Sequence, residues 1–275
     1  MKKVLQDNHY DVVHSNLDPC NFHVARLAKK MNVPVRISHS HTVGCCHNKL
    51  KLKVQQILMR RWATNYIACS QKSGDYWYGE NRCNLIHCGL DVETLKHCAE
   101  SPKSKNEILV LARYSKEKNP FFIVEIIAEL IKKNKDTHVT WCGDGELKEP
   151  ILDAIKAAKI ERHFSMIGYT DNVFPYLEKA SYLLIPSLTE GLGLCTIEAQ
   201  IAGMTVFASE AIPQEANYGR VTFLTLSQSA REWAEAIYKD MTSSTVSQLD
   251  PRIFDDFDRA KIANHFIDKI YKCRK

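Results

Sequence analysis

Short blocks of hydrophobic and polar residues alternate along the first hundred residues and predict strands and helices in turn. Apolar runs typical of buried strands are followed by stretches whose apolar residues recur at helical spacing. The predicted strands are YDVVHSN, VPVRISHSH, TNYIACS and NLIHCGLD, and the predicted helices are CNFHVARLAKKMN and KLKVQQILMRRWA. This order is typical of βαβ units with parallel strands.

A second series of the same kind begins with EILVLARYS and runs to the helical stretch SAREWAEAIYKDM. Its further predicted strands are HVTWCGDG, FSMIGYT, SYLLIPS, MTVFAS and VTFLTL, which makes about six parallel strands. Helical patterns, among them PFFIVEIIAELIKKN and LKEPILDAIKAAKI, separate most of these strands. The chain is therefore predicted to be an α/β protein.

The polar segment AESPKSKN, at residues 99–106, separates the two series and is the predicted domain linker. Residues 1–98 are assigned to a first domain and residues 99–253 to a second. From 254 to 275 the chain has Phe257, Ile262, Phe266 and Ile270 at helical spacing. We expect this segment to form a helix that packs back on the first domain.

Composition excludes several classes of protein. With 45% hydrophobic and 25% charged residues, the 275-residue chain is ordinary for a globular protein. A net charge of +5 does not indicate nucleic-acid binding, but it suits an anionic ligand or a weak association with acidic membrane surfaces. The ten cysteines form no C-x-x-C pair, and there is no apolar leader or span-length segment. We therefore expect reduced thiols in a cytoplasmic protein.

Two carboxylates flank a glycine-bearing turn in SLTEGLGLCTIEAQIAG, at residues 187–203. Glu190 follows a predicted strand, where ligands bind in parallel sheets, and Glu198 is expected in the first turn of the next helix. Gly191 and Gly193 let backbone N–H groups approach a ligand closely. Because a carboxylate accepts hydrogen bonds from adjacent hydroxyls, the pattern indicates a sugar or ribose site.

This motif resembles that of retaining glycosyltransferases with the GT-B fold, in particular family 4, whose members build capsular and other surface polysaccharides. The family pattern is E-G-F-G-L-x-x-x-E-A, and residues 190–199 read EGLGLCTIEA, with Leu192 at the aromatic position. The resemblance implies two Rossmann-like domains with parallel sheets. It assigns Glu190 to the transferred sugar and Glu198 to the ribose. It also implies that the sugar and phosphates face the backbone amides of Gly191, Leu192, Gly193 and Leu194.

Arg113 and Lys118, in LARYSKEKNPFF, resemble the paired basic residues that bind the donor diphosphate in this family. Asn119 is a candidate N-cap and Pro120 a suitable first helical residue. Lys118 would then lie at the positive end of a helix dipole, where an anion relieves the repulsion. Two solvated surface cations are the alternative interpretation.

Weaker signals complete the predicted site. Gly143 resembles the family's glycine turn, and Gly168 lies in IGYTDNV, which occupies the place of the base-contacting loop. His39 and His41 are interpreted as projecting to opposite faces of a strand, so that at most one enters the site. The resemblance favours His41 as the histidine that faces donor sugar and acceptor. We expect no metal and no cofactor beyond the UDP- or GDP-type donor.

The helix LKLKVQQILMRRWA carries Lys51, Lys53, Arg60 and Arg61, with Lys49 preceding it. It is either an interfacial helix near a lipid-linked acceptor or a solvated basic face on a packed helix. The first interpretation adds peripheral membrane association to the expected partners.

Relative to the family, about 70 residues before YDVVHSN are expected to be missing, so that the first domain is incomplete. Such a sheet would expose apolar surface and an open strand edge, which a homodimer could cover. Two functions follow: a retaining glycosyltransferase acting on a saccharide or lipid-linked acceptor, or a truncated homologue that binds nucleotide sugar without transfer. A dinucleotide-dependent oxidoreductase lacks its G-x-G-x-x-G motif here, and a sugar-nucleotide epimerase is a minor alternative.

Overall fold

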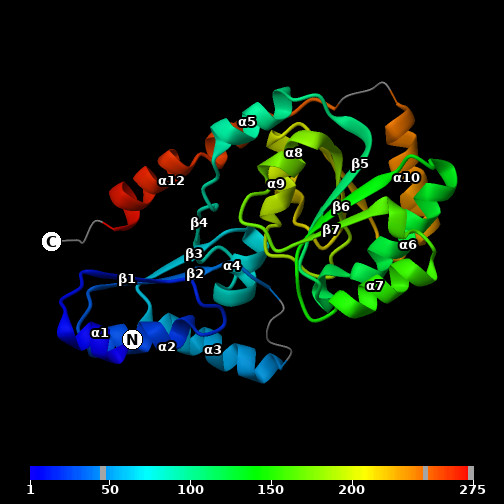
Figure 1. Cartoon of the computed structure of the whole chain (residues 1–275). Coiled ribbons are helices and arrows are strands. Elements are labelled where there is room, and N and C mark those ends of the chain that lie inside the picture. Colours follow the sequence, from blue (N-terminus) through cyan, green and yellow to red (C-terminus); the bar gives the residue numbers. More distant parts are fainter. Residues whose placement is uncertain (44–47, 244–246, 272–275) are drawn as a thin grey trace. The chain divides into compact units, whose positions relative to one another are not determined.

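The computed structural model describes residues 1–43, 48–243 and 247–271 and divides into two compact units. Unit 1 comprises Met1–Leu90 and Asp255–Lys275, and unit 2 comprises Asp91–Phe254 (Figure 1). In the part of the chain that the structure describes, no helix is long and apolar enough to cross a membrane.

Unit 1 is built on a parallel sheet in the order β1-β2-β3-β4. The strands are β1 (Val12–Ser15), β2 (Val35–Ser40), β3 (Asn65–Ala68) and β4 (Asn84–Leu85). The helices of its N-terminal part are α1 (Lys2–Asp7), α2 (Asn21–Lys30), α3 (Lys49–Trp62) and α4 (Gln71–Tyr78). Sequential strands are neighbours, which is the commoner arrangement in βαβ series.

Two apolar clusters hold this sheet between helices. Met59, Trp77 and Tyr78, from α3 and α4, form one cluster with Ala68 of β3. On the other side, Ile37 and Ile67 pack with apolar residues of the C-terminal segment, namely Ile262, Phe266, Ile270 and Tyr271. That segment is helical over α12 (Arg259–His265) and a π-helical turn (Phe266–Ile270).

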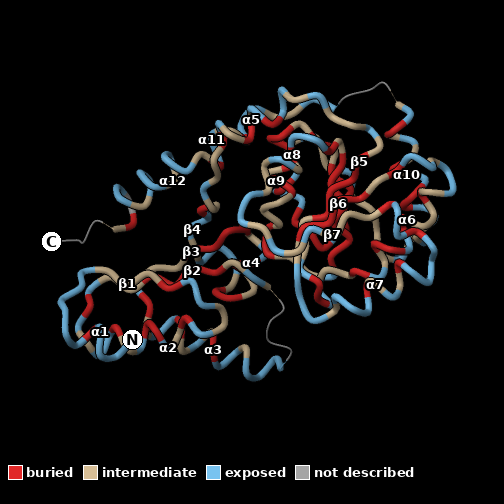
Figure 2. The backbone as a smooth tube through the Cα atoms, in the orientation of Figure 1, coloured by how far each residue is buried: buried red, intermediate tan, exposed pale blue. Residues whose placement is uncertain are grey.

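Unit 2 is a doubly wound sheet of six parallel strands in the order β10-β9-β8-β5-β6-β7. The strands are β5 (Ser104–Leu111), β6 (His138–Cys142), β7 (Phe164–Gly168), β8 (Ala180–Ile185), β9 (Thr205–Ser209) and β10 (Val221–Leu224). Buried residues concentrate along these strands (Figure 2). The strands read as continuous apolar runs because helices cover both faces.

Helices α6 (Pro120–Lys133), α7 (Lys148–Ala157) and α10 (Ala230–Thr242) pack together on one face of this sheet. On the other face lie α5 (Val92–Glu100), α8 (Phe174–Lys179) and α9 (Leu194–Ile201) (Figure 1). Short 3₁₀ turns span Lys116–Lys118, Glu161–His163 and Gln214–Ala216, and α11 (Arg252–Asp256) runs into unit 1.

The segment at 99–106, predicted to link two domains, lies inside unit 2. Helix α5 continues to Glu100 and β5 starts at Ser104, so the polar residues form only a short turn. Because α5 packs on α8 and α9, the division between the units falls after Leu90, before this helix.

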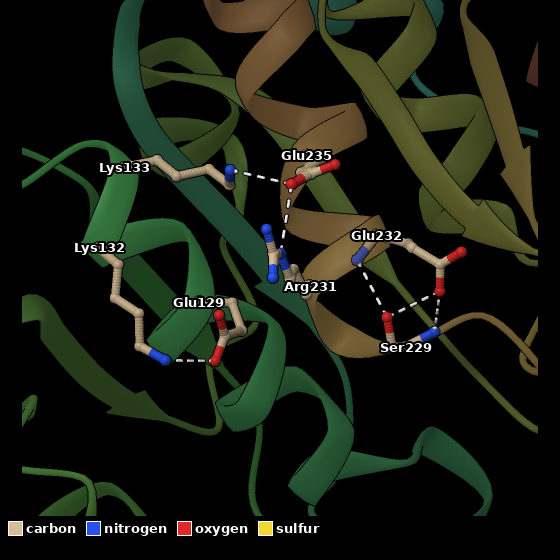
Figure 3. A network of polar contacts seen from close by, with 7 residues as sticks. All are labelled: Glu129, Lys132, Lys133, Ser229, Arg231, Glu232 and Glu235. Carbon is tan, nitrogen blue, oxygen red and sulfur yellow. Dashed lines mark hydrogen bonds and ion pairs between the residues drawn. The ribbon is translucent and has the colours of Figure 1, made fainter.

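Polar contacts cap the start of α10 and join this helix to its neighbour α6 (Figure 3). Ser229 and Glu232 form a capping box at the start of α10: the Ser229 hydroxyl accepts from the Glu232 N–H, and the Glu232 carboxylate accepts from the Ser229 N–H at 2.7 Å. Lys133 of α6 contacts Glu235 of α10 at 3.2 Å. The capping box satisfies backbone donors that would otherwise lack partners at the helix start.

Candidate functional site

The strand order of unit 2 reverses between β5 and β8. From β5 the chain adds β6 and β7 on one side, and it then returns to place β8, β9 and β10 on the other. In an open parallel sheet, the loops that leave the two central strands separate at such a point and leave room for a ligand at the carboxyl ends. The loop after β5 carries Arg113 and Lys118, and the loop after β8 carries Glu190.

Lys118 and Glu190 form an ion pair across this point. The Lys118 ammonium contacts Oε1 of Glu190, and the two side chains are only 19% and 10% exposed. Ser187 donates a second hydrogen bond to the same carboxylate oxygen, at 2.8 Å. The backbone N–H of Leu188 also donates to the carbonyl of Glu117 at 2.7 Å. The structure thus brings together one predicted phosphate-binding cation and one predicted sugar-binding carboxylate.

Local sequence explains why Lys118 lies there. Asn119 is the N-cap of α6 in a left-handed conformation, with φ of 54°, and Pro120 is the first helical residue. Asparagine tolerates this conformation better than most residues do. Lys118 therefore ends a 3₁₀ turn directly before the positive end of the helix dipole. The Asn119 side chain makes no cap hydrogen bond, so its contribution is the shape of the backbone.

A cavity of about 310 Å³ lies beside the ion pair, at the ends of β5, β6 and β7. Its lining includes both predicted cations and one predicted glycine; the residues are Leu111, Ala112, Arg113, Lys118, Cys142, Gly143, Tyr169, Thr170 and Val173. Tyr169 is 81% exposed, which is unusual for an aromatic residue. The cavity thus combines positive charge with an exposed aromatic ring. A cavity of similar volume in unit 1 contains none of the predicted site residues.

The glycines of the site have different structural roles. A Cβ on Gly143 would lie 1.9 Å from the carbonyl oxygen of Ala112, so only glycine permits this approach of two loops. Gly168 has a φ of 81° and open space where a Cβ would point. Gly193 is the N-cap of α9 with a φ of 75°. The side chain of Leu192, at the family's aromatic position, is 2% exposed and belongs to the core.

Glu198 lies in the second turn of α9, because the helix starts at Leu194; the sequence interpretation, which placed it in the first turn, was wrong by that margin. Burial raises the pKa of the Glu198 carboxyl. None of the hydrogen bonds and ion pairs among the described residues involves this carboxylate. Glu198 thus has acceptor capacity free for hydroxyl donors.

Cys195 lies among the charged residues of the site. Burial, together with the charges of Glu190 and Glu198, raises the pKa of its thiol to about 12, while Lys118 acts in the opposite direction. All three charges are therefore close enough to act on one sulfur atom. Because its pKa is so high, the thiol is protonated at neutral pH and is a poor nucleophile.

In unit 1, His39 and His41 lie against each other, with ring centroids 4.1 Å apart. The prediction that they project to opposite faces was wrong, because residues two apart in a strand share a face. His14 of β1 continues the stack: its Nε2 lies 3.1 Å from Nδ1 of His39, and its Nδ1 lies 2.8 Å from the hydroxyl of Tyr271. The ends of β1 and β2 thus carry a column of three imidazoles.

Neighbouring polar groups fix His41. Its Nε2 lies 2.8 Å from Oδ1 of Asn16, its Nδ1 lies 3.5 Å from Sγ of Cys88, and its backbone N–H donates to Asp18 at 2.7 Å. Burial lowers the pKa of His41, and the carboxylate of Asp18 acts in the opposite direction. The imidazole is therefore neutral at neutral pH and can donate or accept a proton.

Sequence reasoning missed several residues that complete these clusters: Ser187, Tyr169, Cys195, His14 and Asp18. A signal existed for two of them, since His14 and Asp18 lie at the end of the strand next to β2, and parallel strands end at one edge of a sheet. Ser187 lies three residues before Glu190, in a loop whose path the sequence does not give. Among the described residues, no group of three or more acidic, histidine or cysteine side chains is arranged to hold a metal.

The segment that carries the donor-side cluster matches a known family. Residues 105–242, half of the chain, match the family model described as "Glycosyl transferases group 1". The chain belongs to the group 1 glycosyltransferases. The family match covers Arg113, Lys118, Glu190 and Glu198 and leaves out His41.

Relatives of this glycosyltransferase come from several bacteria. It is 26% identical over 256 residues to EpsF of Bacillus subtilis, which is named as a glycosyltransferase, covering 85% of this chain and 67% of the relative. The capsular polysaccharide biosynthesis glycosyltransferase CapH of Staphylococcus aureus is 24% identical over 92% of this chain and 75% of its own length. A Campylobacter jejuni N-acetylgalactosaminyltransferase, named for an undecaprenol-linked substrate, is 29% identical over 72% of this chain and 55% of its own length.

Among solved structures, the glycosyltransferase is similar to Anabaena Alr3699/HepE in complex with UDP and glucose. The TM-score is 0.81 at 18% identity, and the match covers 98% of this chain and 80% of HepE. Similarity at this level shows the fold, which is the GT-B type with two Rossmann-like sheets. The predicted fold class is confirmed.

Proposed function

We propose that this group 1 glycosyltransferase moves a sugar, with retention of anomeric configuration, from a nucleotide diphosphate sugar to a hydroxyl group of a saccharide or lipid-linked acceptor. The observation that supports this most is the Lys118–Glu190 ion pair beside the cavity lined by Arg113 and Tyr169. Cations, a carboxylate and an exposed aromatic ring match the diphosphate, sugar and base of such a donor.

In this proposal, Arg113 and Lys118 hold the donor diphosphate. Both cations line the cavity, and Lys118 stands at the start of α6, where backbone N–H groups and the helix dipole also favour an anion. Tyr169 stacks on the base, and the carboxylate of Glu198 accepts hydrogen bonds from the ribose hydroxyls. HepE was solved with UDP, which favours a uridine donor over a guanosine donor.

The transfer step follows from where charge develops. The acceptor oxygen forms a bond to the anomeric carbon while the bond from that carbon to the diphosphate oxygen breaks. The departing diphosphate gains negative charge, which Arg113 and Lys118 stabilise. The acceptor proton passes to the leaving phosphate oxygen on the same face, and this explains retention without an enzymic nucleophile. Glu190 orients the donor sugar. The role predicted for His41, which is to face the donor sugar and the acceptor, stays a prediction.

Names of the relatives support the acceptor class. CapH is named for capsular polysaccharide biosynthesis, and the Campylobacter jejuni relative is named for an alpha linkage and an undecaprenol-linked substrate. We therefore propose that this chain adds a sugar to a saccharide, and that this saccharide is attached to a lipid diphosphate.

Binding of a ligand series tests the donor site. Isothermal titration calorimetry with UDP, UMP and uridine should give the highest affinity for UDP. Lys118→Gln or Arg113→Gln should weaken the binding of UDP by about tenfold or more, since each removes a charge-assisted contact. The affinity for uridine should stay nearly unchanged. Lys116→Gln, an exposed cation of the same turn, is the matched control. Equal losses for all three ligands would contradict the assignment of these cations to the diphosphate.

Turnover and stereochemistry test the reaction. A panel of UDP and GDP sugars should show donor cleavage, and proton NMR of the sugar formed early in the reaction should show the anomeric configuration of the donor. An inverted product would exclude retention. Binding without any cleavage or transfer, with saccharide and lipid-linked acceptors supplied, would indicate a binding protein.

A further inference from the structure

Helix α3 turns apolar side chains away from the unit that it packs on. Its buried residues are Gln55 and Met59, on the side that faces α2 and α4. Leu50, Val54 and Ile57 are 73%, 47% and 61% exposed. At 3.6 residues per turn these three share one face, opposite the buried side. We call them the apolar row.

Cations border the apolar row on both sides. Helical geometry places Lys49 and Lys53 along one edge of the row and Lys51 along the other, and all three are exposed. Arg60 and Arg61 add two more exposed cations near the end of the helix. None of the salt bridges among the described residues involves these five side chains, so no ion pair in that part of the chain neutralises their charges.

Charge is distributed unevenly along the chain around α3. Between Pro19 and Gly74 the sequence has ten lysines and arginines and no aspartate or glutamate. Since the whole chain carries +5, the rest carries a net charge of −5. The segment includes α2, whose last turn has Lys29 and Lys30, and α2 packs beside α3 (Figure 1). The positive potential is therefore concentrated on one helical layer of unit 1.

We infer that the outward face of α3 is a docking surface for a lipid bilayer that contains anionic lipids. An interfacial helix needs apolar side chains that enter the acyl boundary and cations that meet the headgroups. A polyanion such as nucleic acid would use the lysines and leave the apolar row exposed to water. A bilayer accounts for both features, because it buries Leu50, Val54 and Ile57 while it neutralises the lysines.

This surface lies in unit 1, whereas the donor-side cluster is in unit 2. The inference therefore does not depend on the proposed transfer reaction, and the two can fail separately. If it holds, the protein works at the surface where a lipid-linked acceptor would be found.

Flotation with vesicles tests the surface. Full-length protein should bind vesicles of 70% phosphatidylcholine and 30% phosphatidylglycerol at least about tenfold more tightly than pure phosphatidylcholine vesicles. The combined change Lys49→Gln, Lys51→Gln and Lys53→Gln should weaken binding by about a hundredfold. Lys135, Lys148 and Lys156 are exposed lysines of unit 2, and changing them to Gln is the matched control, with little expected effect.

The apolar row separates a bilayer from other partners. Leu50→Ser, Val54→Ser and Ile57→Ser together should weaken vesicle binding by about tenfold or more and leave UDP affinity and the melting temperature nearly unchanged. Ile267→Ser, at a 57% exposed position of the C-terminal segment, is the control. If the apolar row variant binds vesicles as the parent does, the inference is overturned. A basic patch that binds a 20-nucleotide DNA but no vesicles, or an α3-dependent dimer in gel filtration, would also overturn it.

Discussion

The ammonium of Lys118 lies against the carboxylate of Glu190, so that two residues predicted to contact different parts of a donor also contact each other. A diphosphate that binds Lys118 has to compete with Glu190 for the same charge. Ser187 donates a hydrogen bond of 2.8 Å to the same oxygen of Glu190. The ion pair and this hydrogen bond together fix the orientation of the Glu190 carboxylate.

Glu190→Gln is expected to separate nucleotide binding from transfer. Glutamine keeps the shape of the side chain but releases Lys118 from its ion pair, so the affinity for UDP should be unchanged or higher. Transfer should fall by about a hundredfold or more, because the group that orients the sugar loses its charge. Calorimetry with UDP and initial-rate measurements with the sugar donor check the two effects.

Ser187→Ala is the matched control for this change. It removes one hydrogen bond to Glu190 and leaves the charge, so its effect on transfer should be several-fold smaller. If Glu190→Gln weakens the binding of UDP by as large a factor as it slows transfer, Glu190 binds the nucleotide and not the sugar.

Glu198→Gln is expected to make the free protein more stable and the donor complex weaker. Burial raises the pKa of this carboxyl, so its ionised form costs stability in full above the folded pKa, and that cost declines as the pH falls through the folded pKa and is gone below the unfolded pKa. Glutamine avoids the cost, and the melting temperature at pH 7 should rise by about 2 °C. The affinity for UDP should fall by about tenfold, through weaker ribose contacts.

The pH dependence of melting checks the first half of this prediction. The gain from Glu198→Gln should shrink as the pH is lowered, since the parent carboxyl then becomes neutral. A gain that stays constant at acidic pH would mean that charge is not its cause. Exposed Glu210, changed to Gln, serves as the control.

Gly143→Ala and Gly168→Ala should differ in severity. A Cβ on Gly143 would lie 1.9 Å from a backbone oxygen, so the loop after β6 must move and UDP affinity should fall by about tenfold or more. A Cβ on Gly168 meets open space and incurs only the cost of the left-handed backbone, about 1 kcal/mol. Thermal melts and UDP titrations of both variants test this order, and a milder effect at Gly143 would refute the close-approach explanation.

The imidazole column should make unit 1 sensitive to acid. Burial lowers the pKa of His14 from 6.5 to about 4 and that of His39 to about 3. Their stabilising contribution is therefore complete above pH 6.5 and is lost as the pH falls toward 4, because the unfolded chain takes up protons first. The raised pKa of Asp18 acts in the opposite direction and offsets part of this loss.

His39→Phe tests the column, since phenylalanine keeps a ring beside His14 and His41 but cannot be protonated. The fall in melting temperature between pH 7 and pH 5 should be smaller than in the parent by about 2 °C or more. His97→Gln, on an exposed face of α5, should leave the pH dependence as it is. An unchanged pH dependence in His39→Phe would show that the column does not govern acid stability.

Ser229→Ala should destabilise unit 2 without any effect on ligand binding. The Ser229 hydroxyl caps α10, which packs on α6, and loss of such a cap costs about 1 kcal/mol. The melting temperature should therefore fall by about 2–4 °C, with UDP affinity unchanged. Ser229→Asp keeps an acceptor at the N-cap and should restore most of the loss; failure to do so would assign the effect to another contact.

The sequence predicted most of unit 2 because its signals are local. Six apolar runs and the helices between them are each long enough to be recognised, and Pro120 marks the start of α6 correctly. Helix α4 was missed although Ser70 caps it, because its eight residues include Gly74 and show little apolar periodicity. Helix α5 was also missed: residues 92–98 were assigned to the first domain and residues 99–100 to the linker, and only the packing of this helix on α8 and α9 assigns it to unit 2.

Within the site, sequence reasoning found the residues but not their contacts. Lys118 and Glu190 are 72 positions apart, and only the strand order β8-β5 brings their loops together. The stacking of His14 on His39 depends in the same way on the register of β1 and β2. Such contacts follow from topology, which a single sequence does not specify.

The hydrogen bond from the Leu188 N–H to the Glu117 carbonyl joins the backbones of the loops that carry Glu190 and Lys118. Each loop therefore supports the other, and a replacement for either loop has to keep the backbone path that makes this bond. For engineering, the two segments form one cassette: a graft intended to change donor preference has to transplant residues 113–120 and 186–193 together.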